Sequence, residues 1–131
     1  MKILMIRGIP EGEPGMKTVS ENFYITDYMI NKKLNDVLLG SDLIIGRSGY
    51  STIMEIVSLG KKAIFIPTPG QTEQEYLADF FMQKKIFYTH SQRNFNLQKA
   101  LEASREFRGM KVTKEANGKL SQTIAEWLRS L

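Results

Sequence analysis

The sequence contains no cysteine, so disulfide bonds and thiol chemistry are excluded. It has no run of about 18 apolar residues, which is the length that a membrane-spanning helix requires. Residues 1–7 do not form a secretory signal, because their apolar stretch is short and no small-residue cleavage pattern accompanies it. These absences predict a cytoplasmic protein.

Groups for metal binding and acid–base chemistry are also scarce. His90 is the only histidine, and it follows a predicted strand, where a general base could stand. No orienting carboxylate is predicted beside it, so a surface position is the favoured interpretation. The sequence has no cluster with metal-ligand spacing, no obvious carboxylate pair, and neither a GxGxxG nor a Walker-type loop. We therefore predict no metal site and no cofactor.

Length and charge limit the classes of protein that remain. With 131 residues, 42% of them hydrophobic, the chain suits a single domain over residues 1–131. The formal net charge of +4 would suit nucleic acid or a phosphorylated ligand. The basic residues are scattered, however, and are not interleaved with aromatic residues as in a nucleic-acid groove. We predict no nucleic-acid partner, and a phosphate-binding or nucleic-acid-binding domain is kept as a lesser alternative.

Short apolar segments alternate with amphipathic segments along the chain. We expect strands at residues 2–7, 23–26, 42–46, 63–66 and 86–89, and helices at 31–39, 52–59, 73–83, 97–105 and 119–130. The continuously apolar strands suit a sheet that is covered on both faces. The pattern predicts an α/β fold, a Rossmann-like parallel sheet with helices on both faces, whose ligands bind beyond the carboxyl ends of the strands.

The turn at residues 47–55 joins a predicted buried strand to a predicted helix. Gly49 permits close approach of a ligand to the backbone, and the hydroxyls of Ser51 and Thr52 lie beside free helix N–H groups, which suit a diphosphate. The Glu55 carboxylate could accept hydrogen bonds from the two hydroxyls of a ribose. Thr52 and Glu55 also have the spacing of a capping box, which needs no ligand. Both interpretations stay open at this point.

The turn at residues 67–76 follows the next strand and opens the next helix. Gln71 and Gln74 could bond sugar hydroxyls through their amides, and Thr72 and Glu75 form a second candidate capping box. The carboxyl ends of parallel strands meet at one edge of a sheet. Two such turns on neighbouring strands would therefore face one crevice.

Residues 42–67, DLIIGRSGYSTIMEIVSLGKKAIFIP, resemble the C-terminal, nucleotide-sugar donor domain of GT-B glycosyltransferases of family 28, the family of the peptidoglycan N-acetylglucosaminyltransferase. The resemblance extends over residues 2–88 and is most specific over residues 42–76. It implies that the ligand is a UDP-sugar, UDP-N-acetylglucosamine above others, bound as a substrate without a metal.

The resemblance assigns donor binding to both turns and to one loop nearer the N-terminus. Residues 48–52 would approach the diphosphate, Glu55 the ribose, Gln74 the transferred sugar and Met29 the uracil. The implied donor-binding set is Met29, Arg47, Ser48, Gly49, Tyr50, Ser51, Thr52, Glu55, Gln71, Gln74 and Glu75.

Departures from the family pattern limit what the chain is expected to do. Family members begin this domain with a strand and a Gly-Gly-Ser-type loop, and they carry the catalytic base on an acceptor-binding domain. We expect a GT-B C-terminal domain that lacks its first strand, has two unpaired strand edges and supplies no catalytic residue. The unpaired edges would permit a homodimer. An acceptor-binding domain or subunit would be needed, and the complete enzyme would associate peripherally with the inner face of the membrane.

We therefore predict the donor-binding part of a hexosyltransferase, inactive without an acceptor domain. The alternative is a non-enzymatic α/β module that dimerises or docks with a partner chain.

Overall fold

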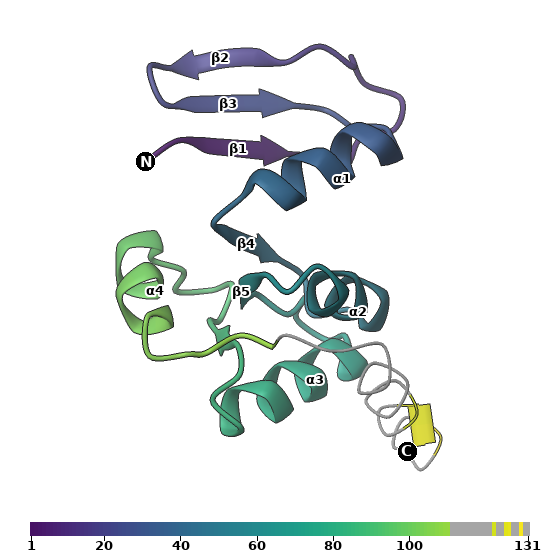
Figure 1. The fold of residues 1–131 in the computed structure, drawn as a ribbon, viewed down its shortest axis with the longest axis vertical. Helices are drawn as coiled ribbons and strands as arrows, with labels where there is room; N and C mark the ends of the chain where they lie inside the picture. Colours follow the sequence, from purple (N-terminus) through teal and green to yellow (C-terminus); the bar gives the residue numbers. More distant parts are fainter. Residues whose placement is uncertain (111–121, 123–124, 127–128, 130–131) are drawn as a thin grey trace. The chain divides into compact units, whose positions relative to one another are not determined.

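The computed structural model describes residues 1–110, 122, 125, 126 and 129 (Figure 1). Most of the helix expected at residues 119–130 lies outside the described residues, and the four residues described there, 122, 125, 126 and 129, are helical. The chain divides into two compact units, Met1–Gly40 and Ser41–Leu131, and each is described by itself. The expectation that the chain forms a single domain stays a prediction.

The first unit is a small mixed sheet followed by a helix. Its strands are β1 (Ile3–Ile6), β2 (Lys17–Ser20) and β3 (Phe23–Thr26), and the helix is α1 (Asn31–Gly40). The strand order is β1-β3-β2, with β1 parallel and β2 antiparallel to β3. The strand β2 was not predicted from the sequence, because its four residues are all exposed and show no apolar alternation.

The second unit is a parallel sheet with helices between its strands. Its elements over residues 41–110, in chain order, are β4 (Leu43–Gly46), α2 (Tyr50–Ser58), β5 (Lys62–Phe65), α3 (Thr72–Gln83), β6 (Tyr88–Thr89) and α4 (Leu97–Ser104). The strand order is β4-β5-β6, and both pairs are parallel. The expected strand at residues 86–89 is shortened to its last two residues.

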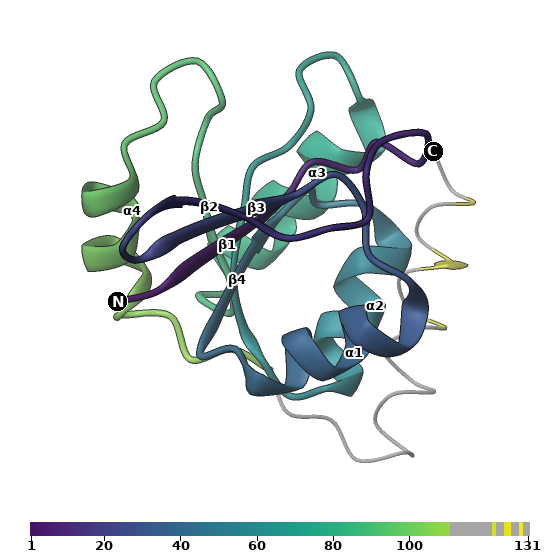
Figure 2. The same cartoon turned by 90° about the horizontal axis from the view of Figure 1, so that it is seen from above.

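The core of the second unit is built on both faces of β5. Ala63 and Phe65 face a buried cluster drawn from α2, α3 and the segment before β6: Ile53, Ile56, Val57, Leu77, Phe81, Ile86 and Phe87. The Phe65 and Phe87 rings meet edge to face, with centroids 5.2 Å apart. Ile64, also fully buried, points to the opposite face because side chains alternate along a strand. The helix α4 contacts β5 and β6 on that face (Figure 2).

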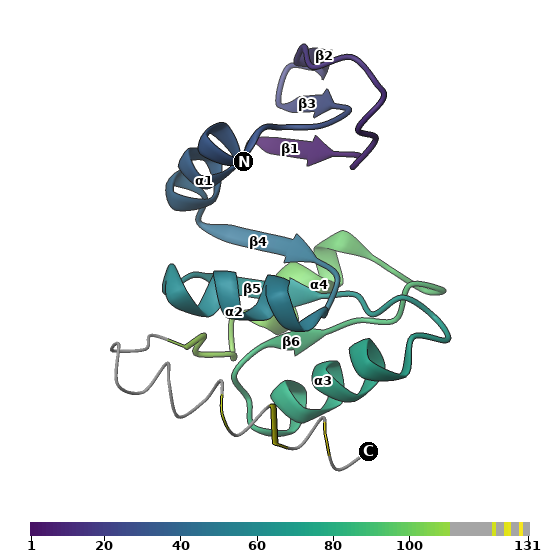
Figure 3. The same cartoon turned by 90° about the vertical axis from the view of Figure 1, so that its right-hand side faces the viewer.

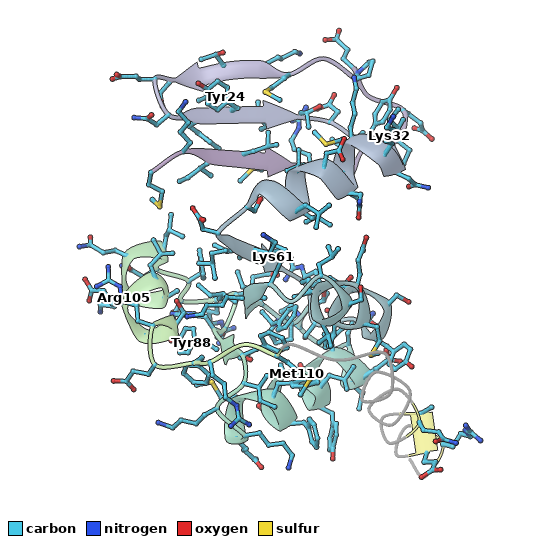
Figure 4. All side chains as sticks on the ribbon, in the orientation of Figure 1. Tyr24, Lys32, Lys61, Tyr88, Arg105 and Met110 are labelled. Atoms are coloured by element: carbon cyan, nitrogen blue, oxygen red, sulfur yellow. The ribbon has the colours of Figure 1, made fainter. Side chains whose placement is uncertain are left out.

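The ends of the second unit are secured by contacts with chain segments outside the helices. Tyr88 of β6, which is labelled in Figure 4, packs its ring against Phe107 after α4, with ring centroids 5.5 Å apart. The Lys61 ammonium donates a hydrogen bond to the Ser41 carbonyl at 3.0 Å, just before β4 begins.

The expected α/β class, with parallel strands and helices on both faces, is confirmed. The departures are the antiparallel strand β2 and the presence of two sheets among the described residues.

Candidate functional site

The two turns singled out in the sequence follow neighbouring parallel strands. β4 leads through residues 47–49 into α2, and β5 leads through residues 66–71 into α3. The arrowheads of β4 and β5 point the same way in Figure 3, so both turns leave the sheet at one edge. This is the edge at which ligands of parallel α/β sheets bind.

Ser48 joins the two turns from within. Its side chain is fully buried, and its hydroxyl donates a hydrogen bond of 2.7 Å to the backbone carbonyl of Gln74 in the first turn of α3. From the family resemblance, Ser48 is expected among the groups that contact a diphosphate. In the structure its hydroxyl has a protein partner instead, 26 residues away in sequence.

The helix α2 begins two residues earlier than predicted. Gly49 is its N-cap, with φ −72° and ψ 148°, and no side chain caps the helix. Thr52 is therefore the third helical residue, and the capping box predicted for Thr52 and Glu55 is wrong. The first intrahelical bond runs from the Ile53 N–H to the Gly49 carbonyl, which leaves the earlier N–H groups of the helix for other partners.

Glu55 and Ser51 lie four residues apart on α2, so they share one face of the helix. Both are exposed. The described residues provide no hydrogen-bond partner for the Glu55 carboxylate. The Ser58 hydroxyl approaches Glu55 only at its backbone carbonyl, at 2.7 Å. The Glu55 carboxylate is thus open to a ligand at the first turns of α2.

The helix α3 also starts without the predicted cap. Its N-cap is Gln71, which is exposed and makes no capping bond, and Thr72 is the first helical residue. The predicted capping box of Thr72 and Glu75 is therefore wrong as drawn. Glu75 does reach back, however: its Oε1 accepts the Gly70 N–H at 3.1 Å, one residue before the N-cap. Gly70 has φ +83°, a left-handed conformation that favours glycine.

Gln74 is fixed by its side chain as well as by its backbone. Its Oε1 accepts the Thr68 N–H at 2.8 Å. An N–H donor requires the amide oxygen there, so the Gln74 Nε2 group carries the remaining donors. Gln74 is half-buried, and the described residues offer no acceptor to its NH2 group. This amide is predicted from the sequence to contact the sugar, and the NH2 group is the part still available for such a contact.

Arg47 and Phe95 line an open hollow at the carboxyl ends of β4 and β5. The hollow has a volume of about 410 Å³ and is lined by Ile45, Gly46, Arg47, Ile66, Gln92 and Phe95. The Arg47 Nη1 donates a hydrogen bond to the Ile66 carbonyl at 3.1 Å, and this bond holds the guanidinium along the turn after β5. Phe95 and Gln92 were missed in the sequence. The only signal was an aromatic residue within a polar loop.

His90 stands beside this hollow. Its Nδ1 lies 2.8 Å from the Ser91 carbonyl, which can only accept, so that nitrogen carries the proton. Its ring meets the Phe95 ring edge to face, with centroids 5.3 Å apart. The residue is half-buried rather than fully exposed.

In the first unit, Asp27 organises the loop after β1. Its carboxylate accepts hydrogen bonds from the Arg7 guanidinium, with Nε at 2.8 Å, and from the Glu13 N–H at 2.9 Å. These bonds, that from Arg7 first, hold the pKa of Asp27 below its ordinary value. Met29, expected beside the uracil, follows in the same unit and is half-buried.

The described residues contain no group of three or more acidic, histidine or cysteine side chains that could hold a metal ion. Among the same residues, no helix is long and apolar enough to cross a membrane.

Comparison with known proteins gives one family and several relatives. A family model for the glycosyltransferase family 28 C-terminal domain matches residues 2–127. Two curated relatives share the name UDP-N-acetylglucosamine--N-acetylmuramyl-(pentapeptide) pyrophosphoryl-undecaprenol N-acetylglucosamine transferase. That of Oenococcus oeni is 44% identical over 57 residues, 44% of this chain, and that of Sulfurihydrogenibium sp. is 36% identical over 70 residues, 53% of this chain. The matches span only 15% and 18% of those relatives.

A solved structure shows the same fold. The NMR solution structure of ALG13 is similar over 85% of this chain and 57% of that chain, with a TM-score of 0.61 and 18% sequence identity.

Proposed function

The chain belongs to the glycosyltransferase family 28 C-terminal domain family, and from that membership we propose that it binds UDP-N-acetylglucosamine, or a related UDP-sugar, as the donor of a glycosyl transfer. The observation that carries the proposal is the pairing of the two strand-to-helix turns. They leave one edge of the parallel sheet and are linked by the Ser48–Gln74 hydrogen bond. The groups open to a ligand include the Glu55 carboxylate and the Gln74 NH2 group.

The diphosphate, the ribose and the transferred sugar each have a chemical counterpart in these turns. The diphosphate would lie at the N-terminus of α2, where N–H groups and the Ser51 and Thr52 hydroxyls donate and the helix dipole favours an anion. The exposed Glu55 carboxylate would accept the ribose hydroxyls. The Gln74 NH2 group would donate to an oxygen of the sugar. Gln71 and Glu75 flank it, and the contact of Met29 with the uracil stays part of the proposal.

The chemistry proposed is direct displacement at the anomeric carbon of the donor sugar by an acceptor hydroxyl. The bond from that carbon to the diphosphate breaks as the new glycosidic bond forms, and UDP leaves. This chain would stabilise the negative charge that develops on the diphosphate. The proton of the acceptor hydroxyl would be taken by a base on an acceptor-binding domain or subunit. The described residues alone are therefore expected to bind donor without turnover.

Calorimetric titration with UDP and with UDP-N-acetylglucosamine tests the proposal. We expect weak binding, reduced about tenfold or more in Glu55→Ala because a charge-assisted hydrogen bond is lost. Thr52→Val should also lower the affinity for both ligands. Glu102→Ala, which removes an exposed glutamate of α4, is the matched control and should bind like the wild type. Equal affinity of wild type and Glu55→Ala would refute the assignment of the ribose site.

A second candidate, a module that docks with another chain, is favoured by one feature of β4. This strand pairs only with β5 among the described residues, and its Ile45 side chain is 41% exposed. An edge strand with apolar side chains is a template for strand pairing. Light scattering over a range of concentrations distinguishes a monomer from a homodimer, and Ile45→Lys should abolish any association through this edge.

A further inference from the structure

Within the described part of the chain, the buried hydroxyl of Ser48 makes one hydrogen bond. A buried hydroxyl without a hydrogen-bond partner destabilises the fold. Ser48 has none of its surface exposed, and its hydroxyl donates to the Gln74 carbonyl at 2.7 Å. That carbonyl lies in the first turn of α3, where the helix itself supplies an N–H donor four residues later. The bond is therefore needed by Ser48 rather than by Gln74. Its effect is to fix the start of α3 against the turn that opens α2.

Gln74 is thereby held at two points. Ser48 fixes its backbone, and the Thr68 N–H fixes its side-chain oxygen at 2.8 Å. The amide group is planar, so its NH2 group lies in one plane with the oxygen that the Thr68 N–H holds, and this bond limits the directions in which the NH2 group can donate. The donor direction of Gln74 is thus restricted by two residues that offer nothing to a ligand through these bonds.

We propose that Ser48 is a positioning residue, which orients the Gln74 NH2 group toward an oxygen of the donor sugar and so lets the site distinguish a UDP-sugar from UDP. This rests on the proposed donor function and assigns Ser48 a different part in it from direct contact with the diphosphate. The chemistry of the NH2 group defines what it recognises: a hydroxyl or an acetamido carbonyl oxygen accepts its hydrogen bond, whereas a protonated amine does not.

The proposal separates two affinities that a direct contact would change together. UDP lacks the sugar, so it is bound without the Gln74 NH2 group. Loss of the Ser48 hydroxyl should therefore lower the affinity for UDP-N-acetylglucosamine by about fivefold, the worth of one neutral hydrogen bond, and leave the affinity for UDP unchanged. The preference for UDP-sugar over UDP is the quantity that Ser48 controls.

The test measures this preference by calorimetry in Ser48→Ala, Gln74→Ala and the double variant. Ser58→Ala is the matched control. The Ser58 hydroxyl also donates to a backbone carbonyl, that of Glu55, but Ser58 lies at the end of α2 that is farther from the two turns. If Ser48 acts through Gln74, the preference falls in each single variant and falls no further in the double variant. Ser58→Ala should keep the wild-type preference.

Gln74→Glu tests the same proposal and leaves the buried residue Ser48 unchanged. A carboxylate oxygen can still accept the Thr68 N–H, but the NH2 donor is gone, so the preference for UDP-sugar should fall while the melting temperature is retained. The proposal is overturned if Ser48→Ala keeps the wild-type preference, or if it lowers both affinities equally. In either case UDP binding by the wild type would leave the donor function standing. Failure of the wild type to bind either ligand would overturn both.

Discussion

The Glu73 carboxylate of α3 accepts a hydrogen bond from the backbone N–H of Tyr50, the first residue of α2, at 3.4 Å. A negative charge thus already lies at the helix end where the diphosphate is proposed to bind. The charge is favourable for the free protein, because a helix N-terminus attracts anions. It is unfavourable for a second anion at the same place.

Glu73→Gln is therefore expected to strengthen UDP binding. Removing one negative charge at a helix end should raise the affinity by about twofold to fivefold at low salt, and the gain should shrink as salt is added. Titration of both proteins with UDP at two salt concentrations measures the effect. Weaker binding by Glu73→Gln would show that the carboxylate supports the site rather than competes with its ligand.

Asp27 should make the first unit sensitive to acid. Because the pKa of Asp27 in the folded chain lies below its ordinary value of 3.8, the ionised carboxylate stabilises the fold at pH values above 3.8. That contribution is lost as the pH falls from 3.8 through the folded pKa. Asp27→Asn should therefore reduce the hydrogen-exchange protection of the Glu13 amide at neutral pH but not in strong acid. Asp36→Asn, at an exposed position of α1, is the control and should leave this amide unchanged.

Gly12 should be required beside Asp27 for steric reasons. A methyl group at Gly12 would lie 2.2 Å from the Asp27 Oδ2 and 2.5 Å from its Cβ, so the aspartate would have to move away from Arg7 and Glu13. Gly12→Ala is thus expected to reproduce the loss of Glu13 amide protection that is predicted for Asp27→Asn. Gly15→Ala is the matched control, because a methyl group there meets nothing within 4 Å. Full protection in Gly12→Ala would contradict this packing.

The strands and helices of the second unit could be predicted because their signal is local. An apolar run of four or five residues between turn residues identified β4 and β5, and glycine or proline marked their ends. The start of α2 was misplaced because Gly49, which offers no side-chain cap, occupies the N-cap in place of Thr52. The strand β2 gave no signal, since hydrogen bonds to β3 and not burial define it.

The candidate site was less predictable, because its key contacts join distant residues. The sequence pattern predicted Ser48 to be a polar turn residue that is open to a ligand. Its hydrogen bond to the Gln74 carbonyl shows instead that it is an interior residue. The spacing of Gln74 predicted an amide at the right turn but not that Thr68 occupies its oxygen. Phe95 reaches the hollow only because the loop before α4 returns to the ends of β4 and β5.

Phe65 and Phe95 should differ sharply in their contribution to stability. Phe65 is fully buried and meets Phe87 edge to face, so Phe65→Ala is expected to cost about 3–5 kcal/mol of unfolding free energy. Phe95 is 37% exposed, and Phe95→Ala should cost less than about 1 kcal/mol. Urea denaturation of both variants gives the comparison. Similar losses would mean that the loop before α4 belongs to the core.

Gly49 should be required for UDP affinity and not for the stability of the fold. Its φ of −72° is open to any residue, and a methyl group there meets nothing within 4 Å, so Gly49→Ala should change stability by less than about 1 kcal/mol. The same methyl group would stand at the N-cap of α2, where a diphosphate must approach the backbone closely. We expect UDP affinity to fall about tenfold or more while the melting temperature holds. Gly70→Ala provides the contrast, because its φ of +83° predicts a loss of stability instead. Unchanged UDP binding by a stable Gly49→Ala would place the diphosphate away from this helix end.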